Sequence, residues 1–109
     1  MLLQTFLNGG VYDGKRVFSR ATVTAMTADQ NLHIKAPWGL GWALGRSIAW
    51  NFFGDLASPS TFGHAGATGT VAWADPEGQL LCIILTDRLL DEGRLLRLVS
   101  NAVAASIEN

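Results

Sequence analysis

Apolar residues near both ends of the chain recur at helical spacing and predict two amphipathic helices. At the N-terminus, one helical face carries Leu2, Leu3, Phe6 and Leu7. Gly9 and Gly10 follow, as glycine does where a helix ends. Near the C-terminus, one face of a closing helix carries Leu95, Leu96, Val99, Ala102, Val103 and Ser106. Asp91 and Glu92 stand at the start of this helix, where the helix dipole favours negative charge.

Turn signals divide the intervening chain into a short hairpin, a second helix and a loop. Residues 11–17 contain Asp13-Gly14, a dipeptide typical of tight hairpin turns. Ser19 is a suitable N-cap for a short helix that runs to Met26. We expect residues 29–37 and 51–60 to be loops, because both are rich in polar and turn-forming residues.

Alternation with a period of two predicts the strands of a sheet. In residues 38–45, bulky side chains at even positions would form one face, and glycine or alanine the other. Residues 61–65 and 70–74 predict two more strands around a glycine-bounded corner at 66–69. Residues 75–78 fit a type I turn. Residues 80–85 are apolar on both faces, which predicts a central strand.

These elements together indicate a single α+β domain over residues 1–109. Strands joined by short turns must be antiparallel. We therefore expect an antiparallel sheet of three to five strands with helices packed on it.

Composition excludes several classes of protein. The 109 residues are 49% apolar and 16% charged, with a formal net charge of −1. Disorder is excluded by the high apolar content, and nucleic-acid binding has no electrostatic basis. The single cysteine, Cys82, excludes an internal disulfide and a cysteine-based zinc site, so we expect neither a metal nor another cofactor. No apolar run approaches the ~20 residues of a membrane span, no signal peptide is recognised, and no compartment is specified.

The apolar content is high for so short a chain. A small domain has a large surface for its volume and should need more polar residues, not fewer. We therefore expect a partner to cover part of the apolar surface. The simplest partner is a second copy in a homodimer, and a complementing chain of unknown identity is the alternative.

Two histidines are the candidate acid–base groups. His33 lies in a polar loop and is interpreted as a surface residue. His64 is flanked by glycines, whose exposed N–H groups could hold an oxyanion or a carboxylate. The alternative for His64 is a tight hairpin in which it bonds a neighbour. Cys82 lies in an apolar strand and is interpreted as a buried, inert thiol.

Five segments stand in a fixed order along the chain. They are residues 7–19, Trp-Gly-Leu-Gly-Trp at 38–42, Phe-Gly-His-Ala-Gly-Ala-Thr-Gly at 62–69, Trp-Ala-Asp-Pro-Glu at 73–77, and Leu-Cys-Ile-Ile-Leu-Thr-Asp-Arg at 81–88. In this order they resemble the C-terminal part of the serine β-lactamase-like family, which includes class C β-lactamases, penicillin-binding proteins and esterases. The resemblance covers essentially the whole chain and implies a partial β-lactamase-like transpeptidase fold.

The resemblance also implies a vestigial substrate and oxyanion site. His64-Ala65-Gly66 matches the family's third motif, which is often His-x-Gly in the esterase and peptidase branches. His64 would orient substrate or support proton transfer, and Ala67, after the motif's Gly66, would offer its N–H to the oxyanion hole. Two positions depart from the family, because Ala65 replaces a hydroxyl residue and Asp87 replaces a common asparagine.

Two motifs that the family needs for catalysis are missing from the sequence. No serine has a lysine three positions later, and Tyr12, the only tyrosine, is not followed by x-Asn. Ser-x-x-Lys supplies the nucleophile, so we expect a truncated hydrolase-like chain without hydrolase activity on its own. One alternative is a small self-associating binding module. Another is a working enzyme in which His64 acts with Asp75 or Asp87 on a different nucleophile.

Overall fold

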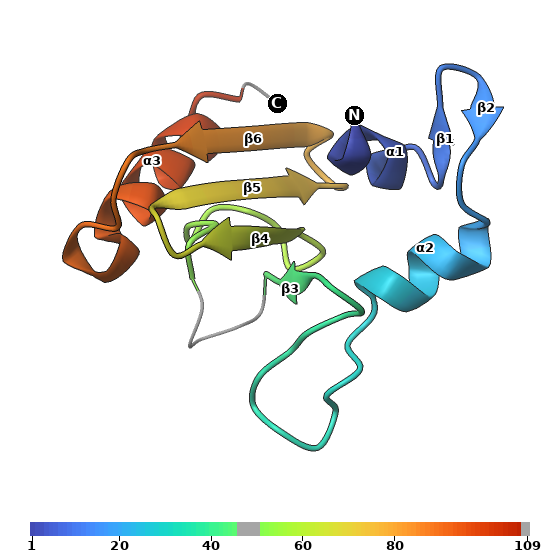
Figure 1. The fold of residues 1–109 in the computed structure, drawn as a ribbon, viewed down its shortest axis with the longest axis horizontal. Coiled ribbons are helices and arrows are strands. Elements are labelled where there is room, and N and C mark those ends of the chain that lie inside the picture. Colours follow the sequence, from blue (N-terminus) through green and yellow to red (C-terminus); the bar gives the residue numbers. More distant parts are fainter. Residues whose placement is uncertain (46–50, 108–109) are drawn as a thin grey trace.

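A computed structural model describes residues 1–45 and 51–107 of the chain. Its main feature is a four-stranded antiparallel sheet in the order β3-β4-β5-β6 (Figure 1). The strands are β3 (Ala43–Leu44), β4 (Phe62–Gly66), β5 (Thr70–Asp75) and β6 (Leu80–Leu85). Helices pack on both faces of this sheet. The predicted α+β class and antiparallel sheet are confirmed.

In the N-terminal third of the chain, the observed elements agree closely with those predicted from the sequence. Helix α1 (Leu2–Leu7) has the predicted bounds, and the hairpin of β1 (Val11–Tyr12) and β2 (Lys15–Arg16) follows it. Asp13 and Gly14 have φ values of 49° and 71°, the positive angles that a tight hairpin turn requires. Helix α2 (Arg20–Thr27) ends one residue later than expected.

The predicted cap of α2 is present and gives a first testable expectation. The Ser19 hydroxyl accepts a hydrogen bond from the Thr22 amide at 3.0 Å. Ser19→Ala leaves this amide without its acceptor and should lower the free energy of unfolding by about 1 kcal/mol in urea titrations. Thr24→Ala, on the same helix, is the matched control and should cost nothing, since alanine is the better helix former. Equal losses in both variants would contradict the capping role.

The strand predicted for residues 38–45 is wrong except at its end. Gly41 has a φ of 83°, and the chain turns back there so that Trp38 forms an isolated bridge with Ala43. The expected bulky face is therefore split, with Trp42 buried and Leu40 52% exposed. Alternation in the sequence cannot reveal a reversal at a glycine, because the pattern is the same on both sides of the turn.

Two hydrophobic clusters lie on the two faces of the sheet. The cluster beneath α1 and α2 contains Leu3, Phe6, Trp42, Leu44, Phe62 and Ala74. The cluster beneath α3 (Arg94–Ala105) contains Ala43, Phe53, Val71, Trp73, Cys82 and Leu96. Cys82 is buried as expected, and this burial raises the pKa of its thiol.

Two expectations about the C-terminal part are wrong. Among the strands that the structure describes, β6 ends the strand order and pairs with β5 alone, so it is not at the centre of this sheet. The predicted closing helix α3 is confirmed, and its apolar face is partly exposed, with Leu96 2% exposed and Leu95 43% exposed. A 3-10 turn, Asp91–Gly93, precedes α3, so the two acidic residues lie before the helix and not in its first turn.

Among the described residues, none of the helices is long and apolar enough to cross a bilayer.

Candidate functional site

His64 stands on β4 with its ring in a defined orientation. Its Nδ1 lies 2.8 Å from the carbonyl oxygen of Ala65. A carbonyl can only accept, so Nδ1 carries the hydrogen, and in the neutral ring Nε2 holds the lone pair. The Trp38 ring meets the imidazole edge-on, with centroids 5.6 Å apart. The residue therefore bonds a neighbour while its side chain remains exposed.

The other two predicted site residues meet at a hollow. Its volume is about 310 Å³, and it is lined by Phe52, Ala65, Gly66, Ala67 and Leu89. His64 is not one of the lining residues, because successive side chains of a strand point to opposite faces and Ala65 faces the hollow. The structure thus brings Gly66 and Ala67 together and directs His64 to the opposite face of β4.

The backbone of the corner after β4 is held so that one amide remains available. The Gly69 N–H donates to the Gly66 carbonyl at 3.1 Å, which closes the turn. The Thr86 hydroxyl donates to the Gly69 carbonyl and fixes the turn from the far side. The Ala67 residue is exposed, and its N–H donates to no residue in the described part of the chain. This amide can therefore donate to a ligand in the hollow.

Two lining residues were missed by the sequence analysis. Phe52 lies in a segment expected to be a plain loop, and Leu89 lies between β6 and the 3-10 turn. No local pattern could identify either one, because each reaches the hollow only after its loop folds back over the sheet.

Asp75 serves the fold and not a catalytic pair. It ends β5, three residues beyond Ala72, the residue opposite His64. This separation corresponds to about 10 Å along the strand. Its carboxylate instead accepts hydrogen bonds from the Ser58 amide (2.9 Å) and hydroxyl (2.5 Å) and from the Glu77 amide (3.0 Å). The structure therefore does not pair Asp75 with His64.

Hydrogen bonding controls the ionisation of Asp75. Burial by itself would raise the pKa of this carboxyl group. The Ser58 hydroxyl and amide, together with the Gly78 and Glu77 amides, more than offset the burial and hold the pKa below its ordinary value of 3.8. Asp75 thus remains charged and binds the loop before β4 to the turn after β5.

Asp87, the other candidate partner of His64, is a surface residue. Its side chain is 84% exposed and lies 3.5 Å from the guanidinium of its neighbour Arg88. An ion pair this exposed stabilises a protein little. Nothing in its environment resembles the buried, oriented carboxylate of a catalytic pair.

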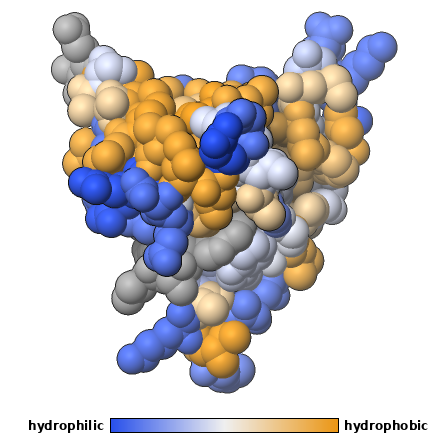
Figure 2. Space-filling model, turned by 60° about the vertical axis from the view of Figure 1, so that its left-hand side comes forward, coloured by the Kyte–Doolittle hydropathy of each residue, from blue (hydrophilic) through white to orange (hydrophobic). Residues whose placement is uncertain are grey.

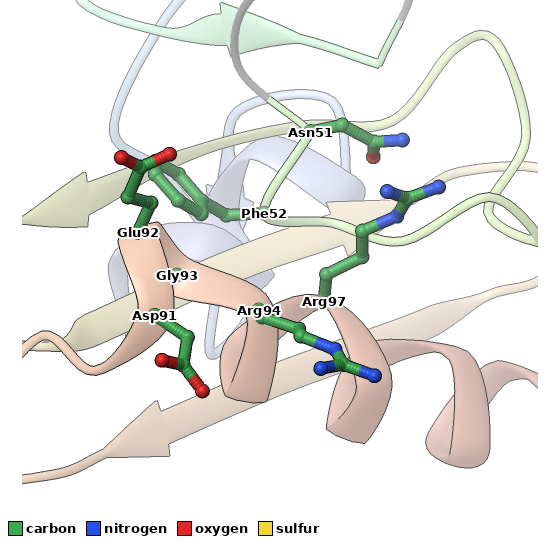
Figure 3. Close-up of a pocket in the computed structure, with 7 residues that line it drawn as sticks. All are labelled: Asn51, Phe52, Asp91, Glu92, Gly93, Arg94 and Arg97. Atoms are coloured by element: carbon green, nitrogen blue, oxygen red, sulfur yellow. The ribbon is translucent and has the colours of Figure 1, made fainter.

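A second hollow, of about 280 Å³, adjoins the first and shares Phe52 with it. Figure 3 shows Glu92 beside the Phe52 ring, Arg97 directed towards Asn51, and Arg94 directed away from both. Asp91, Glu92 and Gly93 have φ values of 48°, 53° and 88°, so the chain enters α3 through three left-handed residues. This sharp turn forms the wall of the hollow.

Arg97 in this second hollow already has an anionic partner. Its guanidinium meets both carboxylate oxygens of Asp55, at 2.8 and 2.9 Å. The Asn101 amide and then Arg97 lower the pKa of Asp55 by hydrogen bonding to its charged form. The pair joins α3 to the loop before β4, which is a structural role.

Comparisons with known proteins agree on one relationship. The model of the family described as Beta-lactamase matches residues 3–105. A putative D-alanyl-D-alanine carboxypeptidase of Escherichia coli O157:H7 is 40% identical over 89 residues, which are 81% of this chain and 20% of that protein. One from Salmonella typhi is 39% identical over the same shares of both chains. The chain thus spans about a fifth of the length of the curated relatives it matches.

Solved structures support the same fold. A β-lactamase from Mycobacterium bovis superposes with a TM-score of 0.77 at 26% identity, over 95% of this chain and 41% of that one. A penicillin-binding protein homologue from Caulobacter crescentus gives a TM-score of 0.68 at 24% identity, over 94% of this chain and 30% of that one. The fold described above is therefore similar to part of each of these larger structures.

Proposed function

Because this chain belongs to the Beta-lactamase family, whose model matches residues 3–105, we propose that it supplies the third-motif part of a serine-hydrolase site. We further propose that these 109 residues, which contain no Ser-x-x-Lys, do not hydrolyse substrate by themselves. The observation that carries the proposal is the corner after β4. There, Gly66 and the Ala67 amide line a hollow that a substrate carbonyl could enter.

Each proposed site residue has a distinct task. When a nucleophile attacks a carbonyl, charge develops on the oxygen, and a fixed N–H such as that of Ala67 stabilises it. Gly66 allows β4 and β5 to approach closely at this corner, because a side chain there would collide with the Thr70 hydroxyl on β5. The His64 ring, oriented through Nδ1, would position substrate or support proton transfer on the other face of β4.

The names of the relatives suggest the class of substrate. Those relatives are a β-lactamase, a penicillin-binding protein homologue and putative D-alanyl-D-alanine carboxypeptidases. We propose that the site accepts an acyl group, as a β-lactam, a peptide or an ester, once a nucleophile is supplied. A single oxyanion donor without a nucleophile leaves only a small part of the catalytic effect.

A chimera tests the proposal directly. The chain alone, offered a chromogenic β-lactam and short aryl esters, should show no turnover above buffer. The chain joined in place of the matching part of the M. bovis β-lactamase should hydrolyse the β-lactam. In that chimera Ala67→Pro removes the N–H and should lower kcat by about 10²- to 10³-fold. Ala67→Gly keeps the N–H and is the matched control.

Two results would contradict the proposal. Turnover by the chain alone that disappears in His64→Ala would identify a complete enzyme. A folded, active chimera in which Ala67→Pro and Ala67→Gly behave alike would show that the Ala67 amide does not serve the oxyanion. The alternative function, a small self-associating interaction module, is favoured by a different observation, the uncovered apolar edge of β6.

A further inference from the structure

The turn at residues 38–42 brings an indole ring against the candidate site residue His64. Gly41 has a φ of 83°, and the chain reverses there so that Trp38 forms a bridge with Ala43 beside the sheet. The Trp38 and His64 rings then lie with their centroids 5.6 Å apart and their planes at 78° to each other. This contact joins a motif of the sequence, Trp-Gly-Leu-Gly-Trp, to a residue of β4.

Hydrogen bonds hold the main chain of this turn in place. The Leu40 amide donates to the Met26 carbonyl near the end of α2 (3.0 Å), and the Gln30 amide donates to the Trp38 carbonyl (2.8 Å). Gly39 passes so close to α2 that a side chain there would collide with the Met26 carbonyl. The indole of Trp38 is partly buried and packs against the cluster beneath α3. Trp38 therefore offers the imidazole a fixed surface.

The same reversal leaves the Ala65 carbonyl at a part of the β4 edge that β3 does not reach. The Gly45 amide donates to the Thr61 carbonyl at 2.7 Å, and hydrogen-bonding residues of an antiparallel ladder recur at every second position. The Ala65 carbonyl therefore points to the same side of β4 as that of Thr61. Pairing with β3 ends before Ala65, and the His64 Nδ1–H donates to this carbonyl at 2.8 Å. The turn thus leaves this acceptor to His64 and places Trp38 beside the ring.

The hydrogen bond to Ala65 is weak as a sole restraint on the ring. His64 is exposed, and water competes for both the imidazole N–H and the carbonyl, so the bond contributes little net free energy. An aromatic pair in an edge-to-face arrangement, with centroids about 4.5–7 Å apart, adds a directional attraction. The contact with Trp38 has this geometry, so it raises the population of one ring orientation over the others.

We propose that Trp38 is a positioning residue for His64. Its indole restricts rotation of the imidazole and keeps Nδ1 at the Ala65 carbonyl, and because this hydrogen bond selects the tautomer, the neutral ring carries its proton on Nδ1. The inference deepens the proposed function and rests on it for one consequence. A histidine that orients substrate or supports proton transfer acts better from one fixed orientation than from several. The contact itself can be measured without substrate.

Nuclear magnetic resonance of the 109-residue protein tests the contact first. The chain has two histidines, so long-range proton–nitrogen spectra at about pH 8.5, where an ordinary imidazole is neutral, give one set of ring signals for each. His64 should show the Nδ1–H tautomer, and its ring protons should show nuclear Overhauser contacts with the Trp38 indole. A mixture of tautomers at His64, or no contact between the two rings, would overturn the proposal.

His33 serves as the internal reference in these spectra. It is exposed on the loop between α2 and β3, which hangs below the sheet in Figure 1. Figure 2 shows the lower end of the molecule as a narrow projection in which hydrophilic and hydrophobic side chains are mixed. His33 should therefore respond to the solvent and not to the ring at Trp38, and its signals should stay the same in every variant.

Two substitutions at Trp38 separate the ring contact from apolar packing. Trp38→Leu keeps an apolar side chain without a ring, and the ratio of Nδ1–H to Nε2–H tautomers at His64 should fall about 2- to 10-fold. Trp38→Phe restores an aromatic ring and should retain most of the ratio. Leu40→Ala, in the same turn and 52% exposed, is the matched control and should leave the ratio unchanged. Equal ratios in Trp38→Leu and Trp38→Phe would overturn the positioning role, and the wild-type spectra decide it if neither variant folds.

The chimera with the M. bovis β-lactamase shows whether Trp38 acts through His64. Trp38→Leu should lower kcat/KM by about 2- to 10-fold, and in a His64→Ala background it should have no further effect. Losses that add would show that Trp38 acts independently of His64 and would overturn the inference. An inactive chimera would instead contradict the proposed hydrolase site, and the spectra of the 109-residue protein would still decide the role of Trp38.

Discussion

Replacing Trp73 with alanine is expected to lower the free energy of unfolding by about 4 kcal/mol. The side chain is fully buried at the centre of the cluster between β5 and α3. Its indole N–H donates to the Ser100 hydroxyl at 2.9 Å, and that hydroxyl donates to the Phe52 carbonyl at 3.0 Å. The variant therefore leaves a large cavity and removes a link between strand, helix and loop. A whole domain of this size has roughly 5–15 kcal/mol of stability, so the variant should be close to unfolding at 25 °C.

Urea titrations followed by circular dichroism measure this loss, with all variants compared at one fixed protein concentration. Trp73→Phe keeps most of the ring but not the donor, and should cost about 2 kcal/mol. In a double-mutant cycle with Ser100→Ala, the losses should be less than additive, because each variant breaks the same hydrogen bond. A loss below about 1 kcal/mol in Trp73→Ala would show that the cluster is not packed as described.

Replacing Asp75 with alanine is expected to cost about 3 kcal/mol, because it leaves several backbone and hydroxyl donors without their acceptor. These donors are the Ser58 amide and hydroxyl and the Glu77 and Gly78 amides. Asp87→Ala provides an aspartate control, because the Asp87 side chain is 84% exposed and its contact with Arg88 is a surface ion pair of little consequence. Equal losses in the two variants would contradict the role of Asp75 in joining the loop before β4 to the turn after β5.

The hydrogen bonds to the Asp75 carboxylate should also make the free energy of unfolding depend on pH in a defined direction. The pKa of Asp75 is lower in the folded state than its ordinary value of 3.8, so the unfolded chain binds the proton more tightly. The stabilisation is complete well above pH 3.8 and is lost as the pH falls through 3.8 and then through the lowered folded-state pKa. Urea titrations between pH 2 and 7 should show a steeper loss in the wild type than in Asp75→Ala. Asp55 has a lowered pKa in both proteins, so the difference between them isolates Asp75.

Local patterns predicted those elements whose signals lie within a few residues. The Asp13-Gly14 hairpin and the Ser19 cap are specified by residues that constrain or bond their own backbone, and the first helix by the spacing of its apolar residues. The corner at 66–69 and the strands around it were also found, within one residue of their observed ends. Here a glycine or a cap residue has the same effect in any tertiary context.

The candidate site was only partly predictable. The sequence predicted a site of His64, Gly66 and Ala67, and alternation along β4 separates His64 from the hollow that the other two line. Phe52 comes to the same hollow from a loop, and Asp75 is engaged by Ser58, 17 residues away in sequence. Such contacts depend on how loops fold back over the sheet, which no short-range pattern records.

The sequence by itself determined the family motifs, the helices at both ends, the α+β class and a high apolar content. Only the tertiary structure decided which of these apolar residues are buried and which are exposed. Residues 80–85 were predicted to be central because they are apolar on both faces, yet β6 pairs with β5 alone among the strands in residues 1–45 and 51–107. The physical reason is that side-chain hydrophobicity reports burial above and below a sheet, whereas position within the sheet depends on backbone hydrogen bonds to a neighbouring strand. The apolar pattern of residues 80–85 therefore could not indicate on which side β6 would find its neighbouring strand.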